Sequence, residues 1–339
     1  MTTHHAHPDP GRPDPGRPAV AEARGHQLLA VIALVGVTAA WGSTFFMLKG
    51  AVTRVPPADF LSVRFAIAGS VLWALAPRSM LRLTPSVRRH GMLLGAAYGS
   101  GQLLQTWGLE HTSASVSGFV TGMYVIITPL LGAVLLRQLV PPVTWVAIGL
   151  ATGGLGVLSV HGFALGPGES LTLVSAAVYA VHIVGLGAWS TGRDAYGLTV
   201  VQMLTVAVVC SLAALPGGLT LPRTSPDWWV LLYMALVAGA GALLLQTWAQ
   251  AHLPPTRAAI VMTTEPVWAG GFAVTLGDEP IGARLLVGGA LALAAMFLAE
   301  LGPRFGELPG SDQRRPVAEA TSADASAAVL PVEGTTSSA

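Results

Sequence analysis

Charged residues are scarce in this 339-residue chain, at 10% of the sequence against roughly 25% in ordinary soluble domains. Hydrophobic residues make up 52%, so too few charges remain to cover the surface of a water-soluble protein. The net charge of +1 excludes the basic surface that a nucleic-acid-binding protein needs. The composition therefore predicts a protein whose solvent is a lipid bilayer.

Cysteine is nearly absent: Cys210 is the single one and lies within an apolar run, which excludes an intrachain disulfide and a cysteine-rich metal site. The sequence also lacks the Gly-x-x-x-x-Gly-Lys-Ser/Thr loop that cradles nucleotide phosphates, and it lacks a His-Glu-x-x-His metal motif. We therefore expect no catalytic residues, no metal and no cofactor. A membrane-embedded enzyme acting on a lipid or peptide, or a non-transporting scaffold, stays an alternative.

Ten apolar stretches of membrane-spanning length, about 17 to 25 residues, follow one another from residue 28 onward. They cover roughly 28–48, 58–77, 91–109, 115–136, 143–160, 170–189, 198–216, 227–250, 257–276 and 282–300. Residues 1–26 and 302–339 cannot bury enough apolar surface to fold, so we expect disordered tails there. The expected fold class is an all-α membrane protein with ten transmembrane helices.

Arginines set the expected orientation, because basic residues in short loops favour the cytoplasmic side. The loop between the second and third stretches holds Arg78, Arg82, Arg88 and Arg89. If this loop is cytoplasmic, both termini are cytoplasmic, and the inner loops carry seven basic residues against four in the outer loops. The near absence of lysine and the many alanines and glycines are typical of a GC-rich bacterial genome, so we expect a bacterial plasma membrane.

An internal repeat is the most specific feature of the sequence. Leu103-Leu104-Gln105-Thr106-Trp107 recurs as Leu244-Leu245-Gln246-Thr247-Trp248, at an offset of 141 residues. At a similar offset, Trp41-Gly42-Ser43-Thr44-Phe45 aligns with Tyr179-Ala180-Val181-His182-Ile183. We therefore expect two related five-helix repeats, 27–161 and 162–301. A copy of a five-helix unit inserts with the opposite orientation, which gives the inverted repeat seen in many transporters.

Four motifs resemble the EamA-domain branch of the drug/metabolite transporter superfamily. They are Trp41-Gly42-Ser43-Thr44-Phe45, Arg64-Phe65, Thr112-Ser113-Ala114 and Glu265-Pro266-Val267-Trp268. The likeness covers residues 28–300. It implies ten helices in two inverted five-helix repeats and a transporter that exports or imports metabolites, often by exchange for protons. Many relatives end the fourth and ninth helices in Gly-Glu, whereas this chain has Arg137-Gln138 and Gly277-Asp278-Glu279 there.

Polar side chains inside the apolar stretches mark a candidate solute cavity, because a polar group in lipid needs a cavity or a partner helix. Ser117, Thr121, Tyr124 and Thr128 follow helical spacing and share one face. The candidate solute-binding residues are Trp41, Thr44, Gln105, Tyr124, Tyr179, His182 and Gln246. Hydrogen bonding between helices is the alternative role for such side chains.

Glu265 lies inside a predicted span, directly before Pro266, which bends or breaks a helix. A carboxylate is costly to keep charged in a membrane, so Glu265 suits proton coupling, and His182, which titrates near neutral pH, is the second candidate. Glu265 could instead be a structural acid near the membrane surface or pair with Arg257 or Arg64. Arg64 has a charge or structural role: it draws an anionic group into the cavity, pairs with Glu265, or extends toward water.

Together these features predict a secondary transporter for a small organic metabolite or drug, with export coupled to proton antiport by alternating access. Its expected partners are the solute and membrane lipid, and no nucleic acid. Three glycine pairs fit close helix contacts, either within one chain or in a homodimer. They are Gly95 and Gly99, Gly118 and Gly122, and Gly149 and Gly153.

Overall fold

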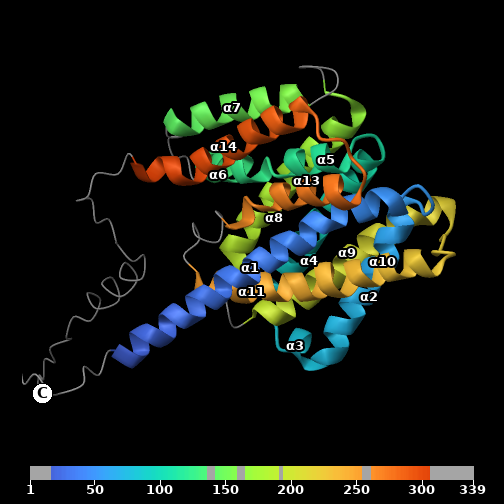
Figure 1. The fold of residues 1–339 in the computed structure, drawn as a ribbon. Helices are drawn as coiled ribbons and strands as arrows, with labels where there is room; N and C mark the ends of the chain where they lie inside the picture. Colours follow the sequence, from blue (N-terminus) through green and yellow to red (C-terminus); the bar gives the residue numbers. More distant parts are fainter. Residues whose placement is uncertain (1–16, 136–141, 159–164, 191–193, 254–260, 306–339) are drawn as a thin grey trace, which may run out of the picture. The chain divides into compact units, whose positions relative to one another are not determined.

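The computed structural model of the protein describes residues 17–135, 142–158, 165–190, 194–253 and 261–305 (Figure 1). All regular secondary structure in these ranges is helical. The helices described below belong to one compact unit that ends at Pro303, apart from the last two residues of the final helix. The all-α fold expected from the sequence is therefore confirmed for the described part of the chain.

The first half of the chain forms seven described helices. They are α1 (Arg17–Ala51), α2 (Pro57–Leu75), α3 (Pro77–Leu81), α4 (Pro85–Glu110), α5 (Ala114–Thr121), α6 (Tyr124–Leu135) and α7 (Pro142–Leu158). Several begin with proline, whose missing amide hydrogen costs nothing at the first helical position. The Ser113 side chain caps α5 by accepting a hydrogen bond from the Val116 amide at 3.2 Å.

The described residues of the second half form six α-helices with two irregular turns among them. They are α8 (Pro167–Trp189), α9 (Ala195–Ala214), the 3-10 turn η1 (Leu215–Gly217), α10 (Ser225–Ala235), the π-helical η2 (Leu236–Gly241), α11 (Ala242–His252), α13 (Glu265–Leu276) and α14 (Ala283–Phe305). Helices α10 and α11 follow each other without a loop, because η2 joins them. The continuous helical segment α10–η2–α11 carries the second copy of the repeated Leu-Leu-Gln-Thr-Trp sequence.

Six helical segments are long and apolar enough to cross a membrane. They are His26–Ala51, Pro57–Leu75, Ala114–Gly132, Pro167–Leu186, Ala195–Gly217 and Ser225–Ala249. Two shorter apolar helices, Pro142–Leu158 and Ala283–Ala299, coincide with two further predicted spans. Helices α4 and α13 cover the remaining two, the second in part because 254–260 lies outside the described residues. A multi-pass membrane fold is thus supported, and the number of ten spans stays a prediction.

The ends of the helical region differ from the predicted tails. Helix α1 begins at Arg17, within the stretch 1–26 that we expected to be a polar tail, and α14 continues to Phe305. Residues 1–16 and 306–339, which hold most of both predicted tails, lie outside the described residues.

Helices of each half pack mainly against helices of the other half. Helix α1 packs against α11 and α13 of the second half, while α8 packs against α4, α5 and α6 of the first. Helix α2 packs against α9, and α5 packs against α13. If α1 is exchanged with α8, α2 with α9, α4 with α10–α11, and α6 with α13, the contacts of α1 with α11 and α13 map onto those of α8 with α4 and α6, and the contact of α2 with α9 maps onto itself. The packing therefore agrees with two related halves.

Glycine permits the closest of these crossings. A Cβ atom added to Gly118 in α5 would lie 2.5 Å from the Cβ of Ala269 in α13, so only glycine fits there. The expected packing role is not confirmed for Gly149 and Gly153, whose added Cβ atoms would meet no described atom within 4 Å. Gly154 faces α14 instead, since a Cβ atom added to it would lie 2.9 Å from the carbonyl oxygen of Gly288.

Candidate functional site

A cavity lies between the halves and is lined by α1, α2, α4, α5, α6, α8, α11 and α13, together with Met262. It offers about 80 Å³ to the centres of water molecules. One water needs about 10–15 Å³ on this measure, so several waters or part of a small solute fit in this conformation. Its lining residues are Trp41, Thr44, Phe45, Leu48, Arg64, Tyr98, Gln102, Gln105, Leu109, Thr121, Tyr124, Tyr179, His182, Ile183, Leu243, Gln246, Met262 and Glu265.

The structure brings most of the residues that the sequence marked for the site into this one lining, although Ser117 and Thr128 are not part of it. The seven candidate solute-binding residues all line the cavity, and so do Glu265 and Arg64. The apolar members were missed, because an apolar side chain in a membrane helix carries no signal of its own. Helical spacing from a polar neighbour could have found them: Leu48 is four residues after Thr44, and Leu109 is four after Gln105.

A chain of hydrogen bonds crosses the cavity wall from α2 to α5. Arg64 Nη1 lies 3.5 Å from Gln102 Oε1, and Gln102 Nε2 donates to the Tyr179 hydroxyl at 2.7 Å. That hydroxyl donates to Gln105 Oε1 at 2.9 Å, and Gln105 Nε2 donates to Thr121 Oγ1 at 3.0 Å. The same side chains therefore line the cavity and link helices, so the two roles that the sequence left open coexist.

Glu265 is the first residue of α13 and is 7% exposed. It accepts a hydrogen bond from the Tyr124 hydroxyl at 3.3 Å. The ion pair found among the described residues joins Arg54 to Asp227, so Glu265 is not paired with Arg64. Arg257, the other predicted partner, lies outside the described residues. The acid thus faces the cavity with a neutral hydrogen-bond donor as its partner.

Arg64 is 4% exposed, so of the three roles that the sequence left open, extension toward water is excluded by the structure. Its Nε donates to the carbonyl oxygen of Met234 at 3.2 Å, and its guanidinium carbon lies 4.8 Å from the centre of the Phe65 ring. The side chain is held inside because a carbonyl and an aromatic face both stabilise the cation.

The π-helical η2 and the end of α10 each supply a carbonyl acceptor to the cavity wall. The indole Nε1 of Trp41 donates to the carbonyl oxygen of Ala238, within η2, at 2.8 Å. Met234, whose carbonyl binds Arg64, lies just before η2. A π turn disturbs the regular pairing of helix carbonyls, and such turns are frequent at functional sites.

His182 is buried, and its imidazole makes a hydrogen bond to a neighbouring helix. Its Nε2 lies 2.8 Å from Gln202 Oε1 in α9. The ring of Tyr98 lies beside it, with the two centres 5.1 Å apart. The imidazole is therefore positioned by α9 while it lines the cavity.

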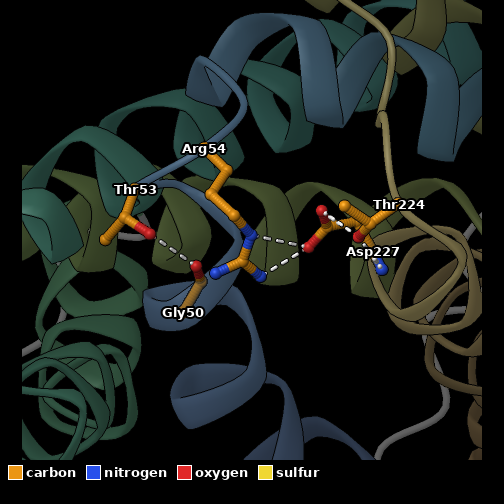
Figure 2. A network of polar contacts seen from close by, with 5 residues as sticks. All are labelled: Gly50, Thr53, Arg54, Thr224 and Asp227. Atoms are coloured by element: carbon orange, nitrogen blue, oxygen red, sulfur yellow. Dashed lines mark hydrogen bonds and ion pairs between the residues drawn. The ribbon is translucent and has the colours of Figure 1, made fainter.

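A salt bridge ties the α1–α2 connection to the start of α10, as Figure 2 shows. Arg54 Nε donates to Asp227 Oδ1 at 2.9 Å, and the Thr224 hydroxyl donates to Asp227 Oδ2 at 2.7 Å. The bond to Asp227 raises the pKa of Arg54, which lies outside the apolar helices. Nearby, the Thr53 hydroxyl donates to the carbonyl oxygen of Gly50 at 2.8 Å (Figure 2).

An apolar helical fold with a polar cavity enclosed between two related halves defines a multi-pass membrane transporter. The family follows from comparison with known proteins: the EamA-like transporter family model matches the chain over residues 28–160 and 166–301. The chain belongs to this family, within the drug/metabolite transporter superfamily.

Two individual proteins are similar to the chain. A protein of Archaeoglobus fulgidus named as an uncharacterized transporter is 27% identical over 278 residues, which cover 80% of this chain and 84% of the relative. A protein of known crystal structure is similar with a TM-score of 0.57 and 21% identity, over 81% of this chain and 98% of the other. At that identity, the second match supports the fold alone.

Proposed function

We propose that the protein is a secondary transporter that moves a small organic metabolite or drug across the bacterial plasma membrane. In this proposal ten transmembrane helices form two inverted five-helix repeats, with both termini in the cytoplasm, and export is coupled to proton antiport. The observation that carries the proposal is the position of Glu265. This acid, buried in an apolar helical bundle, lines the same cavity as polar and aromatic side chains from both halves.

Alternating access is supported by the packing of the halves. Helices from both halves form the cavity walls and pack against each other. Rocking one half against its counterpart therefore opens one end of the cavity while it closes the opposite end. The small free volume fits a conformation in which the cavity is largely closed.

Proton coupling is supported by the surroundings of Glu265. Its partner, Tyr124, is neutral, and Arg64 is too far away to form an ion pair. The carboxyl group can therefore bind a proton or, in its charged form, a cationic group of the solute, but not both at once. Competition of this kind is what exchange of solute for protons requires.

The test begins with the solute, found by comparing metabolites in cells that lack and cells that overproduce the protein. The purified chain is then reconstituted in liposomes, and proton flux is followed with a pH-sensitive dye after the solute is added. We expect solute-driven flux in the wild type and none in Glu265→Gln. The matched control is Glu110→Gln, because Glu110 is exposed at the end of α4. Undiminished coupled flux in Glu265→Gln would reject the role of this acid.

A further inference from the structure

Glu279, in the turn after α13, holds the start of α5 from the other half of the chain. Its Oε1 accepts a hydrogen bond from the Ala114 amide at 2.6 Å. Its Oε2 accepts from the Ser115 amide at 3.2 Å and from the Ser115 hydroxyl at 2.5 Å. These bonds are charge-assisted, and the positive end of the α5 dipole adds to them. One carboxylate thus joins two helices that both line the cavity.

Two more polar contacts hold the turn between α4 and α5 in place. Lys49, in the last turn of α1, donates from Nζ to the carbonyl oxygens of Leu109 at 2.7 Å and Glu110 at 3.1 Å. The Thr112 hydroxyl donates to Glu169 Oε1, in the first turn of α8, at 3.1 Å. The ends of α1, α4 and α13 and the starts of α5 and α8 therefore meet, and we call this end of the bundle the Lys49 end.

The two halves differ at the position of Glu279. The offset of 141 residues that relates the repeated Leu-Leu-Gln-Thr-Trp sequence places Gln138 opposite Glu279. An amide carries no charge, so the equivalent position in the first half cannot supply a carboxylate to a helix N-terminus. Gln138 itself lies outside the described residues, so the comparison of the two halves rests on the sequence alone.

We propose that Glu279 is the latch of the Lys49 end. Its carboxylate holds α5 against the end of α13, and it must leave the Ala114 and Ser115 amides before the cavity opens at this end. Because Gln138 stands at the equivalent position, the resting transporter is closed at the Lys49 end. This inference deepens the proposed function and rests on it only in treating the cavity as the path of the solute.

Accessibility of a cavity cysteine tests the latch without a transport assay. Cys210, the one native cysteine, is buried, so the wild type supplies the unlabelled background. Thr44→Cys places a small reporter in the cavity lining. Gly50→Cys marks the side of the Lys49 end, since no atom of the described residues lies within 4 Å of an added Cβ there. A membrane-impermeant maleimide is applied to right-side-out and to inside-out vesicles from expressing cells.

In the Glu279→Gln background, we expect Thr44→Cys to react about tenfold faster from the side that labels Gly50→Cys, because charge-assisted hydrogen bonds are lost. Glu110→Gln, at the same end, should leave the rate unchanged. Ser115→Ala removes only the hydroxyl bond and should give a smaller increase. If Glu279→Gln does not fold, the labelling rate in the Ser115→Ala background tests the latch instead.

Two outcomes separate the latch from the proposed function. If the rate at Thr44→Cys is unchanged in Glu279→Gln and Ser115→Ala while the wild type transports solute, the latch is overturned and the transport assignment stands. If the rate rises as expected but no solute or proton moves through the wild type, the latch stands and the proton-coupled transporter is rejected.

Discussion

Tyr124 and Glu265 occupy equivalent positions in the two halves, and their side chains meet. They are separated by 141 residues, the same offset that relates Gln105 to Gln246, and the Tyr124 hydroxyl lies 3.3 Å from Glu265 Oε2. Equivalent residues can touch only near the axis that relates the halves. The acid proposed to carry the proton therefore lies where a rocking movement of the halves changes its surroundings most directly.

Tyr124→Phe tests this pairing. The variant keeps the acid and removes its hydrogen-bond donor, which contributes about 1.5–3 kcal/mol when the acceptor is charged. We expect proton-coupled flux in liposomes to fall by at least about tenfold, yet not to vanish as in Glu265→Gln. Tyr196→Phe makes the same chemical change in α9, where the hydroxyl bonds the Leu72 carbonyl outside the cavity. Equal loss in both variants would contradict the role of the pair.

Gln102→Leu tests the hydrogen-bond chain. The change removes the acceptor of Arg64 and the donor to Tyr179, which leaves buried polar groups unsatisfied at a cost of about 1–3 kcal/mol. We expect a lower midpoint of thermal unfolding in detergent. Thr152→Val is the control, because Thr152 is exposed and its hydroxyl bonds only the carbonyl one turn earlier in its own helix. A midpoint equal to that of the control would show that the chain does not stabilise the fold.

Gly118→Val tests the crossing of α5 and α13. A Cβ at this position would lie 2.5 Å from the Cβ of Ala269, so the helices must separate, and we expect destabilisation of about 1–3 kcal/mol or more. The yield of folded protein on size-exclusion chromatography and the thermal midpoint measure the effect. Gly149→Val supplies the comparison, since its added Cβ meets no described atom within 4 Å. Similar loss in both variants would refute the specific contact.

Arg54→Gln tests the salt bridge of Figure 2. The Arg54 side chain is 52% exposed, so the pair should contribute less than about 1 kcal/mol. Because the pKa of Arg54 is raised above its ordinary value, the contribution of the pair is fully present below that ordinary value and is lost only as the pH rises through the raised pKa, well above neutrality. We expect a small drop in the thermal midpoint at low salt that shrinks in about 1 M salt. A drop that is independent of salt would exclude an electrostatic origin.

Cysteine labelling of Arg88→Cys and Asp278→Cys tests the inverted arrangement. Arg88 lies in the first turn of α4, a helix of 26 residues and about 39 Å, whereas Asp278 lies at the Lys49 end, which α4 reaches with its last turn. The two cysteines should therefore react from opposite sides of the membrane. Reaction from the same side would contradict the inverted repeat, and with it the carrier mechanism.

The cavity was predictable because polar side chains are costly in lipid. Polar residues inside apolar stretches, such as Gln105, Tyr179 and His182, therefore indicate a cavity or a helix contact. The repeat added Gln246 by equivalence. The pairing of Tyr124 with Glu265 depends on how two distant helices cross, and neither local spacing nor composition specifies that crossing. Arg64 shows the same limit: the sequence left three roles open, and the carbonyl of Met234 in α10, which holds the side chain inside, belongs to a distant helix.

The latch was beyond prediction for a related reason. Glu279 follows its helix in a polar turn, as many exposed acids do, and its partner Ala114 is 165 residues away. The π-helical η2 likewise has no signature in its small apolar residues. In both cases the physical cause is a contact between elements that are far apart in the chain.

The π-helical η2 has a consequence for the face that α11 presents. Its hydrogen bonds span five residues instead of four, so it accommodates one residue more than a regular α-helical turn. One residue corresponds to about 100° of rotation around the helix axis. Deleting a single residue from Leu236–Gly241 would turn Leu243 and Gln246 away from the cavity and bring other side chains inward, with every helix still formed. The polarity of one whole wall of the transport path thus depends on a surplus of one amino acid.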